Sequence, residues 1–214
     1  MTKEQLVSQI KQKRIELLVK KTIKEPKIIA VACEVMETES SAVKFGAEKV
    51  IRLVSEKDPK LVYPYFDRLV KMTKHENSFL KWGAYLTLAN LAAVDKKNKF
   101  EKVFAEYFKP ITGPQMVTAA NIVGGAAKIA QAKPKLADRI AKEILKVEKG
   151  IYKHKEKVSP ECRQVVCGTA IDSLEIFFDL VSDKKQVLDF VKRQLSSTRP
   201  QVVKGAKKFV KNNE

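Results

Sequence analysis

Hydrophobic residues recur every three or four positions along most of the chain, with polar and charged residues between them. The clearest stretch is 78–94, where Leu80, Ala84, Leu88 and Leu91 follow one another at steps of four, four and three. This spacing places the four side chains on one side of an α-helix. A Gly-Ala pair leaves the middle of that side almost flat, so a second helix can approach its backbone closely. The pattern therefore predicts a helix that packs tightly against a neighbour.

The same spacing predicts helices along the rest of the chain, and capping residues mark several of their ends. Asp58-Pro59 and Ser159-Pro160 each combine an N-cap residue with a proline suited to a first helical turn. The predicted helices cover about 2–23, 26–37, 41–56, 59–72, 77–94, 98–109, a span opening at Gly113-Pro114, 134–149, 160–181, 183–195 and 199–211. Residues 150–158 form the one long connection, and we expect a mobile or inserted element there. No strand is predicted, because every short apolar run lies within helical periodicity.

The predicted helices alternate between a more aromatic one and one that contains small residues. The matching small positions are Gly46, Gly83, Ala119, Gly168 and Gly205, separated by 37, 36, 49 and 37 residues. The irregular step coincides with the connection at 150–158. Self-similarity at about 37 residues, with one helix pair in each repeat, is typical of an α-solenoid.

The second helices of these pairs contain VKFGAEKVIRL, LKWGAYLTLANLA and VVKGAKKFV. They resemble the second helix of HEAT repeats, in which an aliphatic residue is followed by a basic residue, small residues and leucine-like positions. Armadillo-type stacking is a close alternative. The resemblance implies an all-α, right-handed α-α superhelix that binds partners along a concave surface lined by the second helices. It implies one solenoid domain over 1–214, with a capping helix at 1–25 and helix pairs at 26–58, 59–97, 98–133, 134–182 and 183–214.

Composition favours a folded helical protein, since 44% of the residues are hydrophobic, 31% are charged, and there are only 8 Gly and 8 Pro. The apolar runs are far shorter than the roughly 20 residues of a membrane helix. The N-terminus lacks the apolar stretch of a secretory signal. Three cysteines do not make a disulfide framework. We therefore expect a cytoplasmic, monomeric protein with no membrane segment.

The formal net charge of +17, from 42 Lys and Arg against 25 Asp and Glu, indicates attraction to nucleic acid or to acidic proteins. The densest basic run faces only Glu143, Glu148 and Glu156. Its lysines are Lys142, Lys146, Lys149, Lys153, Lys155 and Lys157. Two interpretations stay open for this run: a solvated lysine coat, or a surface that binds phosphate groups.

No arrangement of residues typical of catalysis or metal binding is found. His75 and His154 lie about 80 residues apart, with no acidic residue at the spacing of a zinc motif. Cys162 and Cys167 are five residues apart and do not form a Cys-x-x-Cys motif. Gly124-Gly125 follows no predicted strand and precedes no Gly-Lys-Ser/Thr sequence. We therefore expect a non-enzymatic protein that uses no metal or cofactor.

Three aromatic residues are the best candidates for binding: Phe45, Trp82 and Tyr85. Phe45 and Trp82 occupy equivalent positions beside the Gly-Ala step, about 200° around the helix from the aliphatic residue two positions earlier. They either pack between adjacent repeats or line the concave groove. The candidate groove residues are Lys44, Phe45, Lys81, Trp82, Tyr85 and Lys204. Together they would form an aromatic and basic surface that grips an acidic peptide or stacks on bases.

Two functional classes follow. The first is a HEAT-type scaffold that binds a protein or acidic peptide, favoured because no catalytic set is found and because a fold alone does not define an activity. The alternative is a basic solenoid that binds DNA or RNA. Within this alternative, the chain resembles the bacterial alkylpurine DNA glycosylases in size, basic charge and helix pairing. That resemblance implies DNA held on a concave basic surface, with tryptophans and an acidic residue near the lesion. Trp82 is the one tryptophan here, and no acidic residue is found at its equivalent positions.

Overall fold

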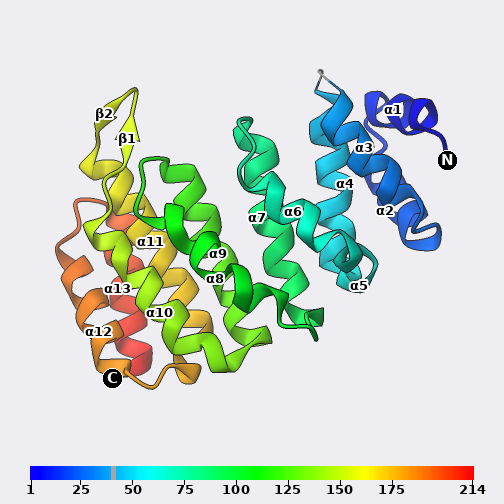
Figure 1. The fold of residues 1–214 in the computed structure, drawn as a ribbon. Helices are drawn as coiled ribbons and strands as arrows, with labels where there is room; N and C mark the ends of the chain where they lie inside the picture. The colour runs from blue at the N-terminus through cyan, green and yellow to red at the C-terminus, as the bar shows by residue number, and fades with distance from the viewer. Residues whose placement is uncertain (40–41) are drawn as a thin grey trace. The chain divides into compact units, whose positions relative to one another are not determined.

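The computed structural model describes residues 1–39 and 42–214, and these are almost entirely helical (Figure 1). Contacts between residues divide the chain into two compact units, unit 1 at 1–100 and unit 2 at 101–214, and each is described by itself. The predicted helix start at Ser41 lies outside the described residues. Within the described ranges, no helix has both the length and the apolar character needed to span a bilayer.

Unit 1 consists of helices joined by short turns. They are α1 (Lys3–Lys11), α2 (Ile15–Lys24), α3 (Ile28–Thr38), α4 (Val43–Lys57), α5 (Pro59–Val62), the 3-10 turn η1 (Tyr63–Tyr65), α6 (Phe66–Met72), α7 (Ser78–Leu91) and the 3-10 turn η2 (Ala92–Val94). The predicted cap at Asp58 is present, since its side chain accepts a hydrogen bond from the Lys60 backbone N–H.

Two predicted helices of unit 1 are interrupted. The single N-terminal helix predicted for 2–23 is wrong, because α1 ends at Lys11 and α2 begins at Ile15. Between them, Lys13 has a φ of +57°, in the left-handed region that a right-handed helix cannot include. The helix predicted for 59–72 is divided by η1, where Pro64 has no N–H to donate.

The glycines of the second helices in unit 1 lie at close contacts with neighbouring helices, Gly46 against α1 and Gly83 against α4. α4 packs against α2, α3 and α7, and α6 packs against α7. A Cβ added at Gly46 would lie 2.3 Å from Cγ2 of Ile10, and one added at Gly83 would lie 2.0 Å from Oε1 of Glu48. The prediction that these glycines permit close helix packing is therefore confirmed.

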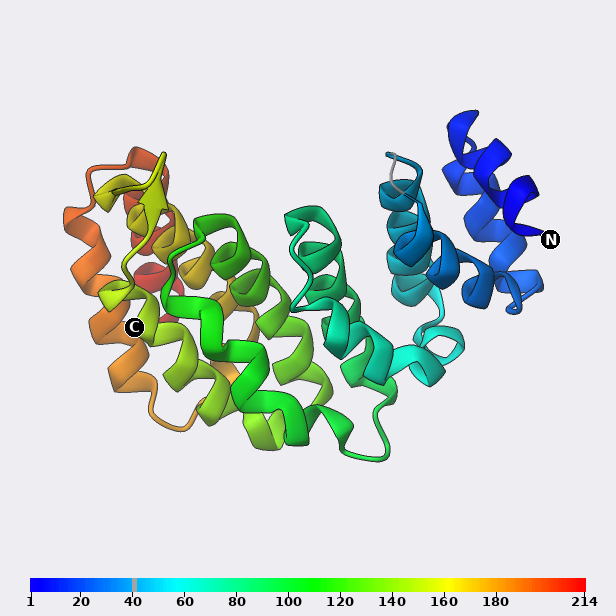
Figure 2. The same cartoon turned by 45° about the horizontal axis from the view of Figure 1, so that its top comes forward.

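Unit 2 begins at Glu101, within α8 (Lys99–Phe108). There follow η3 (Lys109–Thr112), α9 (Met116–Ala132), η4 (Pro134–Leu136), α10 (Ala137–Leu145), η5 (Lys146–Lys149), β1 (Lys153–His154), β2 (Lys157–Val158), α11 (Pro160–Phe177), η6 (Phe178–Leu180), α12 (Lys184–Arg193), η7 (Gln194–Ser196) and α13 (Pro200–Asn213). The second helices α9, α11 and α13 stack in one layer (Figure 2). α10 packs on α9, α11 and α12.

In unit 2, glycines of two second helices face each other's helix. A Cβ at Gly168 would lie 3.0 Å from Cγ2 of Val202, and one at Gly205 would lie 3.8 Å from Cγ2 of Ile171. Both contacts join α11 to α13. The repeated glycines therefore lie at helix contacts, and Gly83, Gly168 and Gly205 lie where consecutive second helices meet. The predicted all-α repeat architecture is confirmed within each unit. The assignment of 1–214 to one continuous domain stays a prediction.

The connection at 150–158 is a β-hairpin, so the prediction of no strand is wrong. β1 and β2 pair antiparallel, with Lys153 opposite Val158 and His154 opposite Lys157. The base of the hairpin is packed, because Tyr152 is fully buried and its hydroxyl donates a 2.6 Å hydrogen bond to the Ile111 carbonyl. The hairpin itself extends beyond the ends of the unit 2 helices (Figure 1).

Candidate partner-binding surface

Helices α4 and α7 bring three aromatic side chains together in unit 1. The Asn77 side chain caps α7 by accepting hydrogen bonds from the backbone N–H groups of Phe79 and Leu80, which fixes Phe79 in the first turn. The ring centroids of Phe45 and Phe79 are 5.3 Å apart, and those of Phe79 and Trp82 are 5.2 Å apart. Phe79 and Trp82 are neighbours because residues three apart share a helix face. We call Phe45, Phe79 and Trp82 the aromatic cluster.

The aromatic cluster reaches the protein surface. Phe79 is 61% exposed, and Phe45 and Trp82 are partly buried. The Nζ atom of Lys44 lies 5.4 Å from the centroid of the Phe45 ring, within the range of a cation–π contact. Lys81 lies beside Trp82 in sequence and is also partly buried. Contiguous exposed apolar side chains with a polar rim are typical of interaction surfaces.

The structure separates the predicted groove residues into three groups. Phe45 meets α7 through Phe79, so it packs between consecutive pairs while staying partly exposed. Tyr85 is only 2% exposed and therefore offers little surface to a partner. Lys204 is exposed on α13 in unit 2. Sequence reasoning missed Phe79, although its spacing from Trp82 was a signal for a shared helix face.

A carboxylate lies between α4 and α7, in the space that Gly83 leaves. The side chain of Glu48 is 13% exposed, and its Oε1 atom accepts a 3.3 Å hydrogen bond from Nε of Arg52. Burial raises the pKa of Glu48 to about 7, although the Arg52 charge opposes this rise. Arg52 also contacts Glu56, at 3.2 Å from Nη1 to Oε1. The α4–α7 interface therefore contains a group that changes charge near neutral pH.

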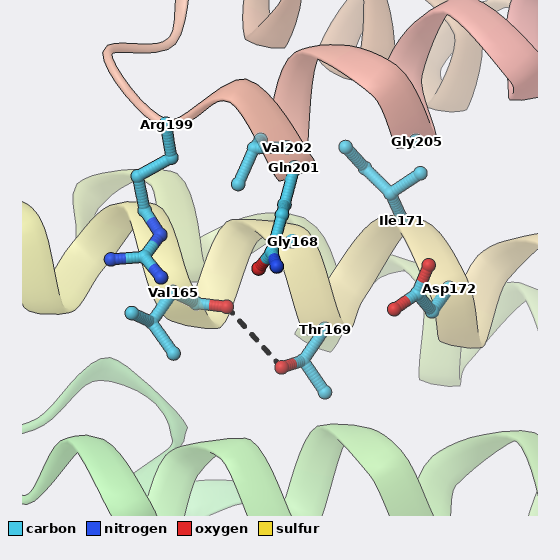
Figure 3. Close-up of a pocket in the computed structure, with 9 residues that line it drawn as sticks. All are labelled: Val165, Gly168, Thr169, Ile171, Asp172, Arg199, Gln201, Val202 and Gly205. Atoms are coloured by element: carbon cyan, nitrogen blue, oxygen red, sulfur yellow. Dashed lines mark hydrogen bonds between the residues drawn. The ribbon is translucent and has the colours of Figure 1, made fainter.

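The second helices of unit 2 enclose a small pocket between α11 and α13 (Figure 3). Its volume is about 200 Å³. Gly168 and Gly205 leave the space, and Thr169, Asp172, Arg199 and Gln201 supply polar groups. The remaining lining residues are Val165, Ile171 and Val202. Arg199 forms an ion pair with Glu161 across the two helices, and partial burial raises the pKa of Asp172.

The predicted basic run lies along α10, η5 and the hairpin, and all six of its lysines are exposed. The three nearby glutamates already have partners. Glu143 pairs with Lys146 at 2.7 Å, and Glu156 lies 3.8 Å from Lys153. Glu148 accepts two 2.9 Å hydrogen bonds from Arg193. Within the described part of the chain, the lysines of this run that form no ion pair are Lys142, Lys149, Lys155 and Lys157.

The titratable groups that could support catalysis are dispersed or buried. Across 1–39 and 42–214, no cluster of three or more His, Cys, Asp or Glu side chains could hold a metal ion. The three cysteines are buried free thiols. Burial raises the pKa of Cys33 to about 11 and that of Cys167 to about 12, so both stay protonated at neutral pH. The absence of enzymatic activity and of a cofactor stays a prediction.

Comparison with solved structures gives similarity over nearly the whole chain. A designed armadillo repeat protein in complex with the peptide (KR)4 matches with a TM-score of 0.59 and 14% identity, covering 98% of each chain. A second designed armadillo repeat protein matches with a TM-score of 0.55 and 16% identity, covering 98% of this chain and 99% of its own. A crystallised engineered protein also matches with a TM-score of 0.55 and 16% identity, covering 98% of this chain and 95% of its own.

These likenesses show an armadillo- or HEAT-like α-solenoid fold, as the repeat pattern predicted. The sequence matches no protein-family model and no curated protein.

Proposed function

We propose that this protein is a non-enzymatic scaffold whose unit 1 binds an extended acidic segment of a partner protein. The binding surface in this proposal is the aromatic cluster with Lys44 and Lys81, on the second helices α4 and α7. The observation that carries the proposal is the exposure of Phe79, at 61%, between two other aromatic rings. The fold supports it, since a designed armadillo repeat protein of similar structure was solved with a bound peptide.

Charge favours an acidic partner. The peptide (KR)4 bound by the designed protein is basic, whereas this chain carries a net charge of +17. Unit 1 alone contains 20 Lys and Arg against 12 Asp and Glu. A basic peptide would be repelled, and an acidic one would be attracted over a distance of about 10 Å at 0.1 M salt.

In this proposal the aromatic cluster would provide most of the binding energy, and the lysines would orient the partner segment through its carboxylates. Binding energy in protein interfaces is concentrated at a few aromatic and Arg residues that become buried. An apolar side chain of the partner would cover Phe79 and Trp82, while its carboxylates would lie near Lys44 and Lys81. In the solenoid this surface would be the concave one, since that is the surface the second helices line in the HEAT-type arrangement that the sequence resembles.

The natural fluorescence of the protein provides the test, because Trp82 is the only tryptophan. The probe is the peptide (EL)4, with (KL)4 as the charge-reversed control. We expect (EL)4 to shift or quench the Trp82 emission in a saturable manner, and (KL)4 to leave it unchanged. A labelled (EL)4 measured by anisotropy then gives the affinity for each variant.

Two variants of matched exposure complete the design. Phe79→Ala should weaken (EL)4 binding by tenfold or more, because it removes the exposed ring at the centre of the cluster. Ile151→Ala removes an equally exposed apolar side chain, also 61% exposed, from unit 2, and should leave the affinity within about twofold. Equal binding by wild type and Phe79→Ala, or equal response to (EL)4 and (KL)4, would exclude this surface as the site.

A further inference from the structure

The hairpin is anchored at its base by hydrogen bonds and a buried side chain, and its tip is exposed to solvent. The backbone N–H of Ile151 donates to the Thr112 carbonyl and that of Lys153 to the Pro114 carbonyl, both at 2.9 Å. Tyr152 lies between these two bonds and is fully buried. A Cβ at Gly113 would lie 2.1 Å from the Ile151 carbonyl oxygen, so the loop before α9 fits closely against the hairpin base.

The turn at the tip of the hairpin consists of two charged residues, although its backbone conformation favours Asn and Gly. Lys155 and Glu156 form the turn with φ values of +48° and +61°. Two-residue hairpin turns with positive φ at both positions strongly prefer Asn-Gly, because other side chains are strained in the left-handed region. The turn therefore presents the Lys155 side chain in solvent at a conformational cost.

Lysines continue from the hairpin down the adjoining helix. Lys142, Lys146 and Lys149 are spaced by four and three residues, so they share one helix face. Lys142 and Lys149 are separated by roughly 10 Å along that face. We call Lys142, Lys149, Lys155 and Lys157, the lysines of the run that form no ion pair among the described residues, the hairpin surface. Its charges are not neutralised by the nearby glutamates, which pair with Lys146, Lys153 and Arg193.

We propose that the hairpin surface binds the phosphate backbone of double-stranded DNA, with the hairpin directed into the major groove. The major groove of B-form DNA is wide enough for a two-stranded β-ribbon. The major groove of an RNA duplex is deep and narrow, and side chains cannot enter it. Lysines outside ion pairs bind phosphates as point charges, and each such interaction releases condensed counterions.

The binding is independent of base sequence in this proposal. Contacts to phosphates fix the position of a protein on the duplex but carry no sequence information directly, and lysine binds a phosphate as a point charge. The site lies in unit 2 and is separate from the aromatic cluster of unit 1, so the two proposals can fail separately.

The test is anisotropy titration of a labelled DNA duplex of arbitrary sequence with the full chain, at several salt concentrations. The test variant carries Lys142→Gln, Lys149→Gln, Lys155→Gln and Lys157→Gln. The matched control carries Lys135→Gln, Lys185→Gln, Lys207→Gln and Lys211→Gln, four exposed lysines of unit 2 that likewise form no ion pair with any described residue. Both variants lower the net charge by the same amount, so only the position of the lysines differs.

We expect the test variant to bind DNA at least tenfold more weakly than wild type at low salt, and the control within about threefold. The slope of log K against log salt should fall by up to about 3.6 in the test variant, since each phosphate that a lysine neutralises adds about 0.9 to the slope. An RNA duplex and polyglutamate of equal charge should bind wild type more weakly than DNA. Undetectable DNA binding at low salt, equal weakening in both variants, or equal binding of polyglutamate would overturn the proposal.

Discussion

Replacing Glu48 by Gln should remove a pH dependence of the stability of unit 1. Glu48 lies between α4 and α7, with a pKa raised from 4.5 to about 7 by burial. In the native state it therefore binds a proton more tightly than in the unfolded state. The free energy of unfolding that it contributes is fully present below pH 4.5 and is lost as the pH rises through 7.

The size of the effect follows from the shift. One pKa unit corresponds to about 1.4 kcal/mol, so a rise from 4.5 to about 7 gives roughly 3 kcal/mol between the two pH limits. Arg52 reduces the cost of the ionised form at high pH but does not cancel it. In Glu48→Gln, Arg52 still pairs with Glu56, so no buried charge is left without a partner.

The assay is urea denaturation of wild type and Glu48→Gln at several pH values between about 4.5 and 8, followed by the fluorescence of Trp82 in unit 1. Other titrating groups contribute equally to both proteins, so the difference in unfolding free energy isolates Glu48. We expect the stability of wild type relative to the variant to fall by about 3 kcal/mol across this range.

The control is Glu56→Gln, which removes the more exposed carboxylate that contacts Arg52. Exposed ion pairs contribute only about 0–1 kcal/mol, so its stability curve should run parallel to that of wild type. A Glu48→Gln curve that also runs parallel to wild type would refute the argument that burial between α4 and α7 raises this pKa.

Four further substitutions test the packing. Gly124→Ala should raise the unfolding free energy by about 1 kcal/mol through helix propensity, because Gly124 is exposed and its added Cβ would meet only Cγ2 of Thr169 at 3.9 Å. Urea denaturation measures this gain, and a loss of stability would contradict the open space around Gly124. Gly113→Ala should lower stability, since Gly113 has a φ of +112° and its Cβ would lie 2.1 Å from a carbonyl oxygen; a neutral result in the same assay would be inconsistent with this close approach. Tyr152→Phe should lower the unfolding free energy by about 1–2 kcal/mol, because the Ile111 carbonyl loses its hydroxyl donor. Hydrogen exchange of the Ile151 and Lys153 amides should become faster, and unchanged exchange would show that the hydroxyl does not hold the hairpin base in place. Asn77→Ala should cost about 1 kcal/mol by removing the cap of α7, measured by thermal unfolding, and unchanged stability would mean that the cap is dispensable.

The sequence alone determined the helices, their approximate ends and the repeat. Apolar spacing and capping residues act within one turn of helix, so they can be recognised without knowing what lies opposite. The cap at Ser159 followed from these local rules, whereas the interruption of the helix predicted for 59–72 did not. The glycines at the helix interfaces followed from the repeat, because each repeat needs the same close approach to its neighbour.

Tertiary structure decided which side chains meet and which stay at the surface. Phe79 became part of the candidate site only because α7 packs beside α4 and brings it against Phe45. Tyr152 lies in a stretch of mostly polar residues, and its burial depends on the Ile111 carbonyl 41 residues earlier. The charge run shows the same division. The lysines at 142–157 can be identified from the sequence, whereas only the structure shows which of them form ion pairs with the nearby glutamates. These outcomes depend on contacts between distant parts of the chain, and local periodicity carries no information about such contacts.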